Sequence, residues 1–197
     1  MYRLLLLSFL ILAPGLAIAA DTPRKKQVAA APVKVDISKK FKYFKVRGHD
    51  RLSLFRDFQK KSPIKPDGAY DAKLGVTQTA LYVPRLKYHK SADSCAIARV
   101  SVRTDIKVFL PQWVNYRKAD ETERRVWDNL VLRVTVHELV HVAIAERYTH
   151  EIASKISKLT PEPTCEKINR KAGAIVVEMH RRHDAEQRKF DADTAPL

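Results

Sequence analysis

The sequence predicts an α+β fold in which a small antiparallel sheet packs on one long helix and on a C-terminal helix. Segments that alternate apolar and polar residues occupy the first part of the chain. Segments with helical periodicity occupy the last part. Because strands and helices are segregated along the chain, this order does not fit repeated βαβ units.

The first 20 residues have the features of a secretory signal peptide. Arg3 supplies the positive charge, Leu4 to Ala13 form an apolar run, and Ala17 to Ala19 provide a cleavage sequence. The run is too short to span a bilayer comfortably, so we expect cleavage and no transmembrane segment in the mature chain. The protein is then exported, to the periplasm or the extracellular space. An uncleaved membrane anchor stays open as the alternative.

Residues 21–35 mix Pro, Ala and Lys without apolar periodicity, which predicts a flexible arm. Residues 36–197 then form a single domain, because their number suits one compact core.

The next segments predict short elements. Phe41 to Val46 alternates apolar residues with lysine and predicts a strand. Leu52, Phe55 and Gln59 have helical spacing and predict a short helix that ends near Pro63. Residues 64–70 contain Pro-Asp-Gly and predict a turn.

Two further strands are predicted, at 73–83 and at 100–110. In the second, Val100, Val102, Ile106, Val108 and Leu110 share one face, while charged and polar residues share the other. This pattern is typical of a half-buried antiparallel strand.

Two helices complete the chain. Asp120 is placed to cap the first, with Glu123 as its reciprocal partner, and this helix is expected to reach about Tyr148. The second is expected at 164–191, after a loop that contains two prolines.

Cys95 and Cys165 are the only cysteines of the chain. An even number in an exported protein predicts a disulfide. Two free thiols remain the alternative. A Cys2His2 zinc site fits less well, because the two cysteines lack the close pairing that such sites use.

The formal net charge of +15 attracts anionic surfaces, which outside the cytoplasm are envelope polymers and lipid head groups. No nucleic-acid module is visible, so we expect no nucleic-acid partner. A merely solubilising surface explains the charge equally well.

The chemistry-bearing motif is His137-Glu138-Leu139-Val140-His141. Two histidines four residues apart on a helix lie about 40° apart around the axis, so both imidazoles can reach one zinc ion. Zinc lowers the pKa of water toward about 7, and Glu138 is placed to act as general base and acid. Two satisfied core histidines and a surface glutamate are the alternative.

A catalytic zinc site needs a third protein ligand. Arg147 occupies the position six residues after His141, which excludes the class that carries a third histidine there. His150 lies far round the helix from His137. The last helix offers a better set on one face: His180, Asp184, Gln187 and Asp191, with His183 beside them.

These residues make the chain resemble a bacterial family of predicted secreted zinc-dependent proteases (domain of unknown function 922). The matching features are Tyr43 to Gly48, Cys95 with the strand after it, Leu110 to Trp113, Trp127 before the helix motif, Cys165, and Phe190 to Thr194. The family often continues after this last segment with a histidine and a glycine, whereas this chain continues Ala195-Pro196-Leu197. The resemblance implies Asp191 as the third ligand, with His183 and His180 as alternatives.

We therefore expect a zincin-like domain that binds Zn²⁺ through His137, His141 and Asp191. It would hydrolyse a peptide or protein substrate with Glu138 as the general base. Two alternatives stay open: a zinc amidase that acts on cell-wall peptides, and a non-enzymatic basic module that binds the envelope.

Overall fold

The computed structural model describes residues 29–62 and 74–194. The elements in chain order are β1 (Val33–Val46), α1 (Arg51–Lys61), β2 (Val76–Lys90), β3 (Cys95–Trp113), the 3-10 turn η1 (Tyr116–Lys118), α2 (Glu121–Ser157) and α3 (Cys165–Thr194). The predicted α+β class is confirmed. The predicted signal peptide (1–20) and the predicted turn (64–70) lie outside the described residues.

The sheet has the strand order β1-β3-β2. β2 is antiparallel to β3, whereas β1 is parallel to β3, with Val33 opposite Val100 and Val46 opposite Trp113. The sheet is therefore mixed, and the prediction of an antiparallel sheet is wrong for β1. Apolar alternation reveals which face of a strand is buried, but it does not identify the neighbouring strand or its direction.

The strands are longer than their sequence patterns predicted. β1 starts at Val33, so the prediction of a flexible arm through residue 35 is wrong for its last three residues. Pairing with the central strand orders this segment although its own side chains are mostly exposed. β2 likewise continues past the predicted end at residue 83, to Lys90.

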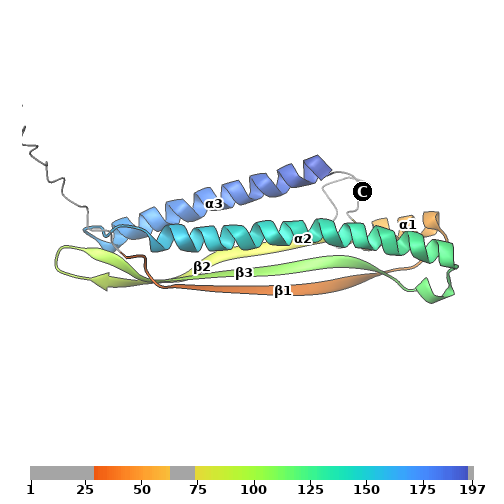
Figure 1. Cartoon of the computed structure of the whole chain (residues 1–197), viewed down its shortest axis with the longest axis horizontal. Helices are drawn as coiled ribbons and strands as arrows, with labels where there is room; N and C mark the ends of the chain where they lie inside the picture. Colours follow the sequence, from red (N-terminus) through yellow and green to blue (C-terminus); the bar gives the residue numbers. More distant parts are fainter. Residues whose placement is uncertain (1–28, 63–73, 195–197) are drawn as a thin grey trace, which may run out of the picture.

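The central strand β3 has the predicted two-faced pattern. Its inward face is buried and consists of Val100, Val102, Thr104, Ile106, Val108 and Leu110. Arg99, Arg103 and Lys107 alternate with these residues and are exposed. Figure 1 shows the helices over one face of the sheet only. The charged side chains of β3 therefore lie on the uncovered face.

The motif helix α2 lies along this inward face. Asp120 caps it, since its carboxylate accepts a hydrogen bond from the Glu123 amide at 2.8 Å. The helix is continuous through Ser157, about nine residues beyond the predicted end near Tyr148. Ile152 and Ile156 explain the extension, because both continue the apolar stripe and are fully buried.

Helix α3 folds back on α2 and runs along its C-terminal half (Figure 1). The predicted disulfide is confirmed: Cys95 at the start of β3 is bonded to Cys165 at the start of α3, with a Cα–Cα distance of 5.0 Å. Beside it, the backbones of Cys95 and Glu162 exchange two hydrogen bonds, of 2.6 and 2.9 Å. The sheet, the interhelical loop and α3 are thus joined at one end of the molecule.

Within the described part of the chain, none of the helices is both long enough and apolar enough to cross a membrane.

Candidate metal centre

The α2–α3 pair brings together three residues that the sequence predicted as ligands. His137 and His141 project from adjacent turns of α2, and Asp191 comes from the last turns of α3. Because the two helices run antiparallel, the C-terminal end of α3 meets the middle of α2 (Figure 1). Among the described residues, these three form a group whose candidate ligand atoms all lie within 4.8 Å of one another.

The three ligand atoms form a nearly equilateral triangle. Asp191 Oδ1 lies 2.9 Å from His141 Nε2 and 3.2 Å from His137 Nε2, and the two Nε2 atoms are 3.2 Å apart. In a tetrahedral zinc site with bonds of about 2.05 Å, the edges between ligand atoms measure roughly 3.3 Å. The triangle is therefore close to the size that three zinc ligands require.

The partner of His141 fixes which of its ring nitrogens carries the proton. Gln187 Nε2 donates to the backbone oxygen of His141 at 3.1 Å, so the amide oxygen of Gln187 faces His141 Nδ1 at hydrogen-bond distance. That oxygen can only accept, so the proton resides on Nδ1. Nε2 is left with a free lone pair, as a metal ligand requires.

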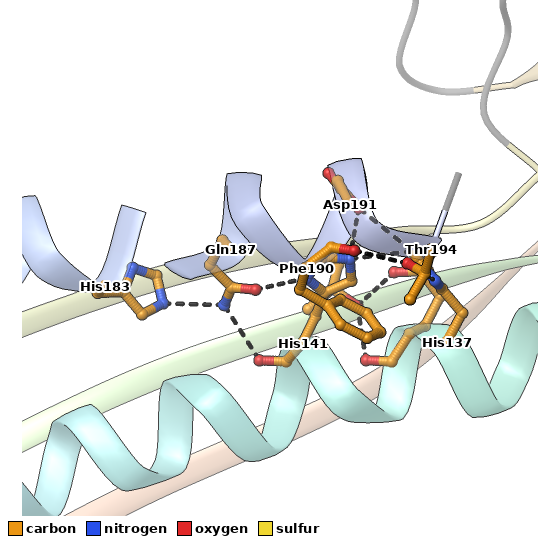
Figure 2. A network of polar contacts seen from close by, with 9 residues as sticks. His137, His141, His183, Gln187, Phe190, Asp191 and Thr194 are labelled. Carbon is orange, nitrogen blue, oxygen red and sulfur yellow. Dashed lines mark hydrogen bonds and ion pairs between the residues drawn. The ribbon is translucent and has the colours of Figure 1, made fainter. Parts of the chain in front are cut away.

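The protonated nitrogen of His137 is fixed in the same way. The hydroxyl of Thr194 donates to the backbone oxygen of Phe190 at 2.6 Å, so its lone pair faces His137 Nδ1 at 3.3 Å. His137 Nδ1 then carries the proton, and its Nε2 lone pair also points into the triangle. Figure 2 shows both contacts from α3 to the two imidazoles.

Phe190 forms an apolar wall against both imidazoles. Its ring stacks on His137 with centroids 4.7 Å apart and meets the His141 ring edge-on at 5.0 Å. An aromatic ring in this position restricts the rotation of both imidazoles and lowers the access of water from that side. It holds the two Nε2 atoms in place without a polar bond of its own.

Glu138 lies beside the triangle and is buried, with 4% of its surface exposed. The Thr77 hydroxyl, from β2, donates to Glu138 Oε2 at 2.7 Å. A Cβ atom at Gly75 would lie 2.8 Å from Glu138 Oε1 and 2.6 Å from Val134 Cγ1, so only glycine fits here without displacing the helix side chains. A hydroxyl of β2 thus holds one carboxylate oxygen, and the chain just before β2 packs closely against the other.

Burial raises the pKa of the Glu138 carboxyl above its ordinary value. The hydrogen bond from Thr77 and the nearby His141 and His137 rings oppose this rise, whereas Asp191 adds to it. A carboxyl with a raised pKa binds a proton more readily near neutral pH, which is what a general base in hydrolysis requires.

The other candidates on α3 lie outside this group. His183, an alternative third ligand, is buried against the Tyr148 ring, and its Nε2 atom contacts Gln187 Nε2 at 3.0 Å. His183 Nδ1 lies 2.9 Å from the Asp184 carboxylate. His180, the second alternative, is three residues further from Asp191 on the same helix. His183 thus touches the residue that orients His141, whereas His180 and Asp184 do not approach the triangle.

Four residues of this site were not predicted from the sequence: Thr77, Gly75, Phe190 and Thr194. Phe190 and Thr194 could have been found, because they follow Gln187 at helical spacing and share its face of α3. Thr77 and Gly75 gave no local signal. They approach Glu138 across 61 and 63 positions of sequence, through the packing of the sheet on α2.

Residues 41–195 match the family model described as bacterial protein of unknown function (DUF922). The match covers most of the chain, so the chain belongs to this family. No curated protein and no solved structure matches the chain. The family that the sequence resembles is therefore confirmed, and its description states no activity.

Proposed function

We propose that this chain is a zinc-dependent metallopeptidase that hydrolyses peptide bonds. His137, His141 and Asp191 hold the zinc ion, and Glu138 is the general base. One observation supports the proposal above all. Two imidazole lone pairs and a carboxylate oxygen face one another at 2.9–3.2 Å beside a buried glutamate. Three acceptor atoms at these distances repel one another unless a proton or a metal cation lies among them, and a zinc ion meets all three at once.

The donor set suits zinc in a catalytic role. Imidazole and carboxylate are ordinary zinc ligands, and three protein ligands leave a fourth position open for water or substrate. Zinc bound there supplies a Lewis acid that polarises a carbonyl oxygen and acidifies water. Zincin-like architecture belongs to the same proposal, since a sheet strand and the motif helix both border the site.

Glu138 performs the proton transfers in this proposal. Its Oε2 atom is held by Thr77, so Oε1 is the oxygen that takes a proton from the attacking water. The same carboxyl then delivers the proton to the leaving nitrogen as the peptide bond breaks. The raised pKa favours both proton transfers, because it brings the pKa of the carboxyl closer to those of the attacking water and the leaving nitrogen.

The disulfide supports the proposed compartment. A covalent Cys95–Cys165 bond persists in oxidising surroundings and is rare in the cytosol. This supports the proposal that the protein acts after export, in the periplasm or outside the cell.

The test is the variant Glu138→Gln, compared with the wild type for zinc content and for peptide hydrolysis. The amide keeps the size of the side chain but cannot take the water proton. We expect about one zinc per chain in both proteins and a loss of about 10²- to 10⁴-fold in hydrolysis rate. Glu121→Gln, on the exposed start of the same helix, is the matched control and should change neither quantity.

The ligands are tested separately. Asp191→Ala and His141→Ala should lose zinc, while His150→Ala, exposed on the same helix, and His183→Ala should keep most of it. Wild-type protein that carries no zinc after purification without chelators contradicts the proposal. Zinc without hydrolysis of any peptide favours the binding module. Cleavage of purified cell-wall peptides but not of protein-derived peptides favours the amidase.

A further inference from the structure

An apolar pocket with a volume of about 260 Å³ lies where α1, the end of β3 and the N-terminal half of α2 meet. Its walls are mainly apolar side chains and include Leu54, Phe55, Leu74, Trp113, Trp127 and Leu130. Arg51 and Glu123 supply the charged groups. The volume suits one large side chain of a ligand.

The pocket and the metal centre share one face of α2. At 100° per residue, Leu130 lies about 20° and Trp127 about 80° round the helix from His137, within the arc that ends at Glu138. Leu130 precedes His137 by about 10 Å along the axis. On the opposite wall, Leu74 is the neighbour of Gly75, which abuts Glu138. The chain at Gly75 covers the middle of this arc, where Val134 is buried, so a ligand reaches from the metal centre to the pocket along the His137–Leu130 edge of the helix.

Part of this apolar surface is in contact with water. Phe55 is 54% exposed and Val126, another wall residue, is 40% exposed. Burying such side chains under a ligand is favourable, because it removes apolar surface from water. Clusters of exposed apolar residues on soluble proteins commonly mark binding sites.

We propose that this pocket binds a bulky apolar or aromatic side chain of the substrate, within about three residues of the scissile bond. The distance sets this limit, since an extended peptide advances about 3.3 Å per residue. The proposal rests on the proposed metallopeptidase function. It adds the substrate class: peptides with a large apolar residue close to the cleaved bond.

The first test uses binding without turnover. Both tryptophans of the chain line the pocket, so their fluorescence reports on its contents. The probes are two blocked pentapeptides, all-alanine and alanine with a central phenylalanine, added to the Glu138→Gln protein with zinc. We expect the phenylalanine peptide to shift and saturate the emission at concentrations about 10- to 100-fold below those of the alanine peptide.

The second test uses cleavage by the wild type and by two lysine variants. The phenylalanine peptide should exceed the alanine peptide about 10- to 100-fold in kcat/KM. Val126→Lys places a charge on the pocket wall and should abolish most of this preference. Val136→Lys is the matched control: this valine of the same helix is 54% exposed and does not line the pocket, so the preference should remain.

The outcomes separate the two proposals. Equal cleavage of both peptides, with unchanged tryptophan emission, overturns the pocket assignment and leaves the metallopeptidase intact. A preference for phenylalanine that persists in Val126→Lys also overturns it. Saturable binding of the phenylalanine peptide without cleavage by the wild type keeps the pocket as an apolar-residue site and contradicts the metallopeptidase.

Discussion

The two halves of α2 differ in what surrounds them. Its C-terminal half is enclosed by the sheet and α3, and Tyr148, Ile152 and Ile156 are each at most 2% exposed. Before Val134, no α2 residue is buried, and Val126 and Leu132 are 40% and 61% exposed. The candidate metal centre lies at the border, where α3 ends (Figure 1). One half thus supplies the stability of the fold, and the other leaves a surface open beside the site.

This division has a physical basis. Under the proposed function, the catalytic side chains must be held to within a fraction of an ångström, and the ligand needs apolar surface that the fold has not already covered. A single long helix meets both demands because it is rigid along its length. Contacts with the sheet and α3 fix the position of the enclosed half. Because the helix is rigid, the pocket wall formed by the exposed half is also held in place.

Removal of the disulfide should have the largest effect on the enclosed half. Cys95 and Cys165 close a loop of 70 residues, so the double serine variant should lose about 4 kcal/mol of unfolding free energy on the chain-entropy model. Urea unfolding of both proteins, each with EDTA, measures the difference. A loss below about 1 kcal/mol would mean that the enclosed half does not depend on its covalent link.

Truncation of one side chain in each half tests directly how much each half contributes to stability. Ile152 is fully buried in the core, so Ile152→Ala should cost about 3 kcal/mol through lost contacts and a cavity. Leu132→Ala, on the exposed half, should change the free energy of unfolding by less than about 0.5 kcal/mol. Equal losses in denaturant unfolding would remove the distinction between the two halves.

The smallest effect is expected at the border. Gln187→Leu removes the acceptor for His141 Nδ1, so zinc affinity should fall about 10- to 100-fold with little change in unfolding free energy. Gln187→Glu keeps an acceptor and should retain most of the affinity. Arg188→Leu, an exposed neighbour, is the control. Competition with a chromophoric chelator measures all three, and unchanged affinity in Gln187→Leu would mean that α3 supplies Asp191 alone.

The sequence predicted the local parts of this arrangement well. Helical spacing placed His137 and His141 on one face of a helix, and alternation identified the buried face of β3. These predictions succeed because both periodicities are set by backbone geometry within a few residues. The extension of α2 to Ser157 was missed, although the spacing of Ile152 and Ile156 already indicated it.

Contacts between residues far apart in the sequence were harder to predict. The residues of β1 do not indicate that it pairs in parallel with β3. The sequence around Thr77 and Gly75 likewise does not indicate that they approach Glu138. The choice between Asp191 and His183 depended on the axial alignment of two antiparallel helices. A difference of eight positions on α3 amounts to about 12 Å along the axis, and only packing sets that alignment.

The disulfide also restricts how the length of this chain can change during evolution. Cys165 and Asp191 lie on one uninterrupted helix, about 39 Å apart along its axis. A single inserted or deleted residue between them would turn the carboxylate by about 100° and move it by about 1.5 Å, away from both imidazoles. Compensation by sliding α3 is prevented, because its first residue is bonded to β3. Length changes in this family are therefore expected elsewhere, and the spacing between this cysteine and this aspartate should be kept.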